Sequence, residues 1–219
     1  MKYFIPMIIL SLVLLSCSKD KDEETQTAAE KAAAAQLVAL EGTWKTECYT
    51  NSDNTSNIDT LTFAGNALTV KEEEHSDTSC ATDYSLEEFP LTFSIGDAVT
   101  FANGKTGHKF TATLGSTYKI TPQSASAVSS FISSSKCSAS NWELNTEKEC
   151  SSGDDAGDIK LCLYQLDGNT LYPKCDDSAY PSTSDIQTDN ASSTFTKQYI
   201  LLVDRCYRIH LMKVGNLYI

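Results

Sequence analysis

The sequence predicts a mainly β protein in which an antiparallel meander of strands closes into a barrel. From Gly42 onward, apolar and polar residues alternate with a period of two, which is typical of strands with one buried and one solvent-facing side. The alternating apolar positions are Leu61 and Phe63; Leu68 and Val70; Leu91, Phe93 and Ile95; Phe110, Ala112 and Leu114; and Trp142 and Leu144. A long meander closes because closure removes its unpaired edges.

Short dipeptides supply the turns of this meander. Each contains residues that readily adopt positive φ, as tight hairpins require. They are Gly65-Asn66, Gly96-Asp97, Asn103-Gly104 and Gly168-Asn169. Successive hairpins place strands that are neighbours in the sequence next to each other in space, which is the definition of a meander.

The chain begins with an export signal. Lys2 precedes an apolar run from Phe4 to Leu15, which is shorter than the roughly 20 residues that a membrane-spanning helix needs. The run ends in Leu14-Leu15-Ser16-Cys17, which resembles the lipobox of bacterial lipoproteins. The resemblance implies a signal peptide over 1–16 and a lipid anchor on Cys17. The alternative is an ordinary secretory signal that happens to end in cysteine.

The same resemblance implies a cellular location. Several acyl chains on Cys17 would anchor the protein stably to a membrane. Ser18, rather than Asp, follows the cysteine, which in this sorting system favours the bacterial outer membrane, on its periplasmic or surface face. The charged residues between Lys19 and Glu24 then form a solvated tether within 17–27.

Two helices are predicted beside the strands. Thr27 and Glu30 form a capping-box pattern ahead of an alanine-rich run, and Gly42 is a natural stop, so we expect a helix over about 28–41. Thr121-Pro122 combines an N-cap with a proline at the first helical position. Apolar residues then recur at helical spacing, which predicts a flanking helix over about 122–134, across one end of the barrel.

One domain, helix plus barrel over 28–197, accounts for most of the chain. The remaining segment, 198–219, is richer in basic residues and has apolar runs, but its charges argue against a membrane span. It is either a final helix or strand pair packed on the barrel, or an extension outside the fold.

The charge balance excludes some partners. The chain has 29 acidic and 17 basic residues, a net charge of −12, and removal of the leader takes away only the positive charge of Lys2. A surface this acidic does not attract nucleic acid or an anionic bilayer through general electrostatics. We expect a monomer whose membrane contact is the lipid on Cys17.

Eight cysteines are present, and lipidation of Cys17 leaves seven in an oxidising compartment. A two-residue turn at Gly168-Asn169 places Cys162 opposite Cys175 at a non-hydrogen-bonded position, where Cα atoms approach to about 4.5 Å. The other expected pairs are Cys48–Cys80, between strand ends, and Cys137–Cys150, which bracket the Trp142 segment. Cys206 is left over, and an alternative pairing such as 150–162 stays open.

The sequence contains no convincing catalytic or cofactor motif. Gly104-Lys105-Thr106 ends like a phosphate-binding loop, but Val99 stands where the first glycine belongs. The aspartates 154, 155 and 158 do not have the spacing of a calcium loop, and the adjacent glutamates 87 and 88 would face opposite ways on a strand. The run 72–75 is interpreted as a solvated strand end or turn rather than as a metal patch. We therefore expect no enzyme, no cofactor and no metal.

Gly42-Thr43-Trp44 opens the first strand directly after a short helix. This resembles the GxW signature of lipocalins and implies that Trp44 closes the barrel floor. In that family an arginine from a late strand meets the tryptophan, and Arg205 and Arg208 are the candidates here. More broadly, 17–197 is similar to small, cysteine-stapled bacterial lipoproteins of unassigned function with a calycin-like barrel.

Two functions follow from these observations. The first is a lipid-anchored, lipocalin-like barrel that binds a small apolar ligand in its interior. The alternative is a protein-interaction or inhibitor module with a filled barrel that recognises its partner through loops such as 151–158 and 176–193. The interior decides between them: if the inward side chains fill it, ligand transport loses its basis. Those side chains are Leu61, Phe63, Phe93, Phe110 and Trp142.

Overall fold

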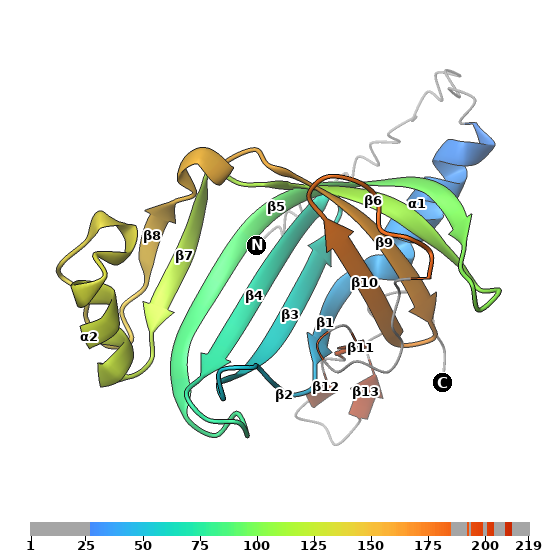
Figure 1. The fold of residues 1–219 in the computed structure, drawn as a ribbon. Helices are drawn as coiled ribbons and strands as arrows, with labels where there is room; N and C mark the ends of the chain where they lie inside the picture. Colours follow the sequence, from blue (N-terminus) through green and yellow to red (C-terminus); the bar gives the residue numbers. More distant parts are fainter. Residues whose placement is uncertain (1–26, 185–191, 193, 199–200, 204–208, 212–219) are drawn as a thin grey trace, which may run out of the picture.

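The computed structural model describes residues 27–184, 192, 194–198, 201–203 and 209–211. This part of the chain is mainly β, with a closed eight-stranded antiparallel barrel and two α-helices (Figure 1). The helices are α1 (Ala28–Leu40) and α2 (Ala125–Ser133). The strands are β1 (Gly42–Thr46), β2 (Tyr49–Thr50), β3 (Ser56–Ala64), β4 (Ala67–His75), β5 (Asp83–Thr100), β6 (Thr106–Leu114), β7 (Thr117–Pro122), β8 (Lys148–Ser151), β9 (Ile159–Asp167), β10 (Thr170–Asp176), β11 (Phe195–Lys197), β12 (Leu201–Val203) and β13 (Ile209–Leu211).

The barrel runs in the order β1, β3, β4, β5, β6, β9, β10 and β11, and β11 pairs with β1 to close it. Glycines with positive φ form the β3–β4 and β9–β10 turns, at Gly65 (φ 59°) and Gly168 (φ 61°), as the sequence predicts. β12 and β13 pair only with each other and form a separate two-stranded sheet.

The sheet continues beyond the barrel. β5 has 18 residues, and its second half pairs with β6 while residues 85–88 pair with β7 along the same edge. β8 then pairs with β7. We call this open part of the sheet the flange: β2, β7, β8 and the segments 56–59, 72–75 and 83–88. In Figure 1, β7, β8 and α2 lie on the side away from β9 and β10.

Helix α1 forms as predicted. Thr27 Oγ1 accepts a hydrogen bond from the backbone N–H of Glu30, and Glu30 Oε2 accepts one from the backbone N–H of Thr27. These two bonds satisfy donors that the first helical turn leaves free. Gly42, with φ 109°, follows the end of the helix and begins β1.

The start predicted for α2 is wrong. Thr121 and Pro122 end strand β7, where they pair with Leu86 and Ser85, and the Pro122 carbonyl accepts a hydrogen bond from the N–H of Asn145. Proline is tolerated here because it stands at the end of the strand. Ser124 is the N-cap instead, and the helix packs against β5 and β7 in the flange rather than across an end of the barrel.

Two other local predictions are wrong. Gly96-Asp97 is not a turn but an irregularity inside β5, where the register with β6 shifts between Ile95 and Ala98. Trp142 and Leu144 do not form a strand; they lie in the loop before β8. Trp142 is nonetheless buried, because its ring packs on Phe131 at 5.1 Å between centroids.

A cluster of buried, mostly apolar side chains packs inside the barrel. The buried cluster contains two edge-to-face pairs, Phe63 with Phe93 and Phe110 with Tyr164, whose centroids lie 5.2 Å and 5.8 Å apart. Its other buried members are Leu40, Trp44, Leu61, Leu68, Ala112, Cys162, Leu171 and Phe195. A second cluster around Phe131 and Trp142 lies under α2, so Trp142 does not belong to the barrel interior.

The three predicted disulfides form: Cys48–Cys80, Cys137–Cys150 and Cys162–Cys175. Cys162 and Cys175 are register partners across β9 and β10, with Cα atoms 4.0 Å apart. The alternative 150–162 pairing is therefore not formed. Cys17 and Cys206 lie outside the described residues, as do the signal segment 1–16, most of the tether 17–27, Arg205 and Arg208.

Candidate functional site

The inner face of the sheet changes character where the barrel becomes the flange. Along β3 the inward positions run from Phe63 and Leu61 to Asp59 and Asn57, because alternate residues of a strand share a face. In the flange the cross-strand neighbours are therefore polar. Asp59 lies opposite Glu72, and Glu72 lies opposite Glu87.

Two residues further along each strand, on the same face, there is a second row. Asn57 lies opposite Glu74, and Glu74 lies opposite Ser85. The two rows together place Asp59, Glu72, Glu74 and Glu87 on one face of three adjacent strands. Like charges at directly opposite positions destabilise a sheet, so this arrangement costs stability.

All of these residues except Asp59 line a cleft with a volume of about 530 Å³. We call it the flange cleft. All the residues that line it are polar or acidic: Asn51, Ser52, Asp53, Thr55, Asn57, Glu72, Glu74, Ser85 and Glu87. Its composition contrasts with the apolar barrel interior next to it, and it suits a polar or charged group rather than an apolar ligand.

Hydrogen bonds hold the carboxylates of the cleft in place. Asn57 Nδ2 donates to Glu72 Oε1, and Ser85 Oγ donates to Glu74 Oε2 at 3.0 Å. Tyr49 OH donates to Asp59 Oδ2 at 2.7 Å. Asp59 Oδ1 is buried and has no hydrogen-bond partner among the described residues. Glu72 and Glu74 are therefore held by neutral donors, whereas the acceptor without a donor, Asp59 Oδ1, lies beneath the surface and outside the cleft lining.

A lysine of the chain lies at the edge of this acidic face. Lys136, in the short 3₁₀ segment after α2, places its Nζ 3.0 Å from Glu87 Oε1. The same Nζ lies 6.0 Å from the ring centroid of Tyr118 and 5.9 Å from that of Phe131. The nearby lysines 45 and 71 instead pair with Glu73 on the opposite face of β4. Among the described ion pairs, the ammonium group of Lys136 is therefore the one that contacts this group of four carboxylates.

Burial and the charges of neighbouring groups shift the pKa values of these side chains. Burial, helped by the charges of Asp59, Glu87 and Glu74, raises the pKa of Glu72 from 4.5 to about 7. Burial also raises the pKa of Asp59, although the hydrogen bond from Tyr49 opposes this. Burial alone would lower the pKa of Lys136, but the hydrogen bond and charge of Glu87 outweigh it and the pKa is raised.

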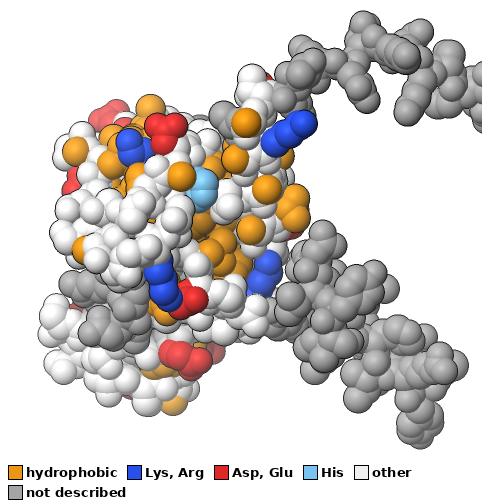
Figure 2. Space-filling model, turned by 90° about the vertical axis from the view of Figure 1, so that its right-hand side faces the viewer, with side chains coloured by type: hydrophobic (Ala, Val, Ile, Leu, Met, Phe, Trp, Pro, Cys, Tyr) orange, Lys and Arg blue, Asp and Glu red, His pale blue; other side chains and the backbone are white. Residues whose placement is uncertain are grey.

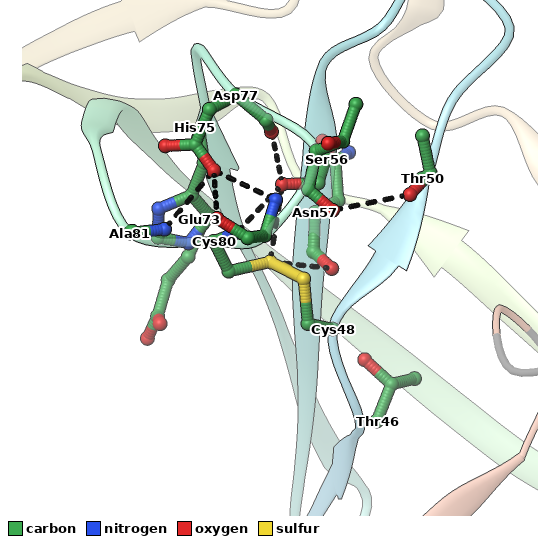
Figure 3. The surroundings of a disulfide bond; sticks show 12 residues. Thr46, Cys48, Thr50, Ser56, Asn57, Glu73, His75, Asp77, Cys80 and Ala81 are labelled. Carbon is green, nitrogen blue, oxygen red and sulfur yellow. Dashed lines mark hydrogen bonds between the residues drawn. A yellow bond between two sulfur atoms is a disulfide. The ribbon is translucent and has the colours of Figure 1, made fainter.

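The Cys48–Cys80 disulfide fixes one rim of the cleft (Figure 3). It joins the chain before β2 to the loop after β4. Around it, Cys80 N–H donates to Ser56 Oγ at 3.1 Å, and Thr50 Oγ1 donates to the Thr78 carbonyl at 3.2 Å. These contacts hold β2, and with it the start of the lining segment 51–55, against the sheet.

Trp44 lies where α1 meets the barrel and is fully buried. Its Nε1 donates to the Leu40 carbonyl at 2.7 Å. Lys197 of β11 lies over its ring, 4.8 Å from the centroid, and donates to the Ala39 carbonyl. Lys197 is thus a basic residue of a late strand that contacts Trp44, and the candidates Arg205 and Arg208 lie outside the described residues.

The sequence did not predict the flange cleft as a site. The run 72–75 was expected to be a solvated strand end, and Glu87 and Glu88 do point to opposite faces, as expected. What sequence reasoning missed is that Glu72 and Glu87 lie side by side on adjacent strands. The register of β4 against β5 would have revealed it, and no local signal specifies that register.

Among the described residues, no group of three or more His, Cys, Asp or Glu side chains has a geometry that could hold a metal ion. Neither described helix is both long and apolar enough to cross a membrane. No protein-family model matches the chain, and no curated protein matches it either. Fold and site together define a class: a closed antiparallel barrel with a buried apolar core that carries an acidic cleft on an extension of its sheet.

Proposed function

We propose that this protein is an extracytoplasmic lipoprotein, anchored through Cys17, whose lipocalin-like barrel is a rigid scaffold for recognition of a protein partner. The observation that carries the proposal is the buried core of the barrel: Trp44, Phe63, Phe93, Phe110 and other bulky side chains form one buried cluster there, which favours a structural core over a ligand cavity. The protein is not an enzyme under this proposal, and its working surface lies outside the barrel.

The sequence and the structure support the proposed extracytoplasmic location in different ways. The apolar leader that ends in Leu14-Leu15-Ser16-Cys17 favours export and lipidation, and we place the protein at the bacterial outer membrane. Disulfides persist in oxidising compartments, and three of them are consistent with an exported chain. Metabolic labelling with a radioactive fatty acid tests the anchor: we expect label on the natural chain and none on Cys17→Ser.

The ligand-binding alternative has one observation in its favour. Figure 2 shows hydrophobic side chains gathered near the middle of one face, among scattered charged groups. Partly buried apolar residues such as Leu37, Ile95 and Leu166 extend the core toward the surface. A patch of this kind contacts a ligand only at its surface, because the interior beneath it is occupied.

Native mass spectrometry of the protein extracted in mild detergent separates the two functions. We expect the mass of the processed chain and its anchor, with no further dissociable component. A stoichiometric apolar molecule that is lost on activation would contradict the filled-barrel proposal. Cys17→Ser, exported without its anchor, is the control that distinguishes a bound lipid from an attached one.

Photo-crosslinking in intact cells tests for a partner. A photoreactive residue in place of Asp53, at the cleft, is compared with one in place of Lys31, on α1. We expect one discrete crosslinked protein from position 53 and none from position 31. Equal labelling from both positions, or no labelling, would oppose a specific interaction module.

A further inference from the structure

We propose that the turn between β5 and β6 is a self-modifying site at which Asn103 is converted to aspartate. Asn103-Gly104 is the single asparagine–glycine step of the sequence. The backbone nitrogen that follows an asparagine can attack its side-chain carbonyl carbon, and glycine leaves that nitrogen unshielded because it has no Cβ. The reaction is independent of the proposed function, because it needs only the chain and water.

The turn is open to solvent. Residues 102–106 are exposed, and a Cβ added to Gly104 would meet no heavy atom within 4 Å beyond its chain neighbours. Gly104 has φ 79°, a conformation that residues with a side chain rarely adopt. Water and hydroxide therefore reach the Gly104 nitrogen, and glycine is the residue that both the turn and the reaction require.

Two hydrogen bonds hold the Asn103 amide in a reactive orientation. Its Oδ1 accepts from the backbone N–H of Lys105 at 3.0 Å, which curls the side chain back over the Gly104 peptide as in an Asx turn. Its Nδ2 donates to Gln165 Oε1 at 2.9 Å. The Lys105 N–H thus already contacts the oxygen that becomes negatively charged when the carbonyl carbon is attacked.

The reaction balances without an oxidant, a reductant or a cofactor. Hydroxide removes the proton that the Gly104 nitrogen donates to the Phe101 carbonyl at 2.9 Å. The nitrogen forms a bond to Asn103 Cγ, Oδ1 takes up the negative charge, and the Cγ–Nδ2 bond breaks as Nδ2 gains a proton from water and leaves as ammonia. Water then opens the five-membered imide at either carbonyl, which gives aspartate or isoaspartate. The net change is the gain of one water and the loss of one ammonia.

Gln165 supplies a donor that the product needs. Its side chain is fully buried, and its Nε2 has no hydrogen-bond partner among the described residues. The Lys105 N–H fixes Oδ1 of Asn103, so Nδ2 faces Gln165 and only Oε1 can accept from it. An aspartate presents an acceptor in place of that donor, and a half turn of the Gln165 amide brings Nε2 to it. Conversion therefore gives a partner to a buried donor.

Two charged groups beside the turn act on the new carboxylate in opposite directions. Lys105 attracts it, and Asp167, which pairs with Lys105 Nζ, repels it. Isoaspartate would lengthen the main chain between residues 103 and 104 and disrupt the hydrogen bonds of the turn. We therefore expect aspartate to be the main product in the folded protein.

Peptide mapping by mass spectrometry follows the reaction in the full processed protein, kept folded at pH 8 in water enriched in heavy oxygen. We expect the peptide that contains residue 103 to gain the mass difference between an amide and a carboxyl group, with one heavy oxygen atom from the opening of the imide. The gain should exceed that at every other asparagine and should be faster at higher pH, because hydroxide removes the Gly104 proton. Asn103→Gln is the matched control: its longer side chain does not close a five-membered ring, so its amide should stay intact.

Urea unfolding tests the part assigned to Gln165. Asn103→Asp, which carries the product side chain from the start, is expected to unfold at a higher urea concentration than the natural protein. In a Gln165→Leu background the same substitution should give no gain, because the donor is gone.

Four results overturn the assignment. They are an intact amide at position 103 after incubation of the folded protein, conversion that occurs only once urea has unfolded it, an Asn103→Asp variant that unfolds earlier than the natural protein, and a gain from Asn103→Asp that persists beside Gln165→Leu. The proposed recognition function is tested separately, by the crosslink from position 53.

Discussion

Replacing Glu72 with glutamine is expected to stabilise the protein at pH 8. Glu72 is partly buried beside Asp59 and Glu87, and its pKa is raised from 4.5 to about 7. A carboxyl with a raised pKa binds more protons in the folded than in the unfolded state between these two pH values. The free energy of unfolding therefore falls as the pH rises through this window, and the full cost is present above pH 7.

The size of the effect follows from the pKa. One pKa unit corresponds to about 1.4 kcal/mol, so an unscreened shift of this size would cost the folded state about 3 kcal/mol at pH 8. Glu72 borders an open cleft, and solvent screening reduces this by about half, to roughly 1.5 kcal/mol. Glu72→Gln removes the charge and keeps an oxygen that accepts from Asn57.

Urea unfolding followed by tryptophan fluorescence, with the disulfides intact, measures the change. We expect Glu72→Gln to exceed the natural protein by about 1–2 kcal/mol at pH 8 and to match it near pH 4. The control, Glu73→Gln, loses ion pairs on the opposite face and is expected to lose under about 1 kcal/mol at either pH. Equal destabilisation of Glu72→Gln at both pH values would refute the reasoning, since the ionisation of Glu72 would then have no effect on the free energy of unfolding.

Three further variants test the fold by the same unfolding assay. Gly107→Ala is expected to cost about 2–3 kcal/mol, because its Cβ would lie 2.0 Å from a carbonyl oxygen of β9, whereas Gly96→Ala, with its nearest atom at 3.4 Å, should cost under about 1 kcal/mol; equal losses would contradict this. Serine at both Cys48 and Cys80 removes a bridge across a separation of 32 residues and should cost about 3–4 kcal/mol, and an unchanged midpoint would show that the bridge contributes nothing. Trp44→Phe leaves a buried α1 carbonyl without its donor and should cost about 1–3 kcal/mol; a neutral result would mean that water replaces the donor.

Local signals predicted the features that depend on neighbours in the chain. The capping box of Thr27 and Glu30 specifies where α1 begins, because both hydrogen bonds lie within one helical turn. The turn at Gly168 sets the register of β9 and β10, and that register brings Cys162 opposite Cys175. Such predictions need no information from distant segments.

Tertiary packing overrode local signals elsewhere. Thr121-Pro122 has the composition of a helix start, but pairing with β5 keeps it in a strand. The alternation around Trp142 suggested a strand, yet the ring is buried against Phe131 from a loop. Gly96 provides turn chemistry, but β5 continues past it and pairs with β6 both before and after the irregularity. In each case contacts with distant residues outweigh a local preference.

The sequence by itself determined the β class, the first helix and the Cys162–Cys175 disulfide, because short-range periodicity, caps and turns encode them. Only the tertiary structure decided between the alternative pairings of the other cysteines, that β5 extends into a flange, and that carboxylates from two adjacent strands line one cleft. The physical reason is register. Glu72 and Glu87 become neighbours through the alignment of β4 with β5, and that alignment depends on the whole sheet.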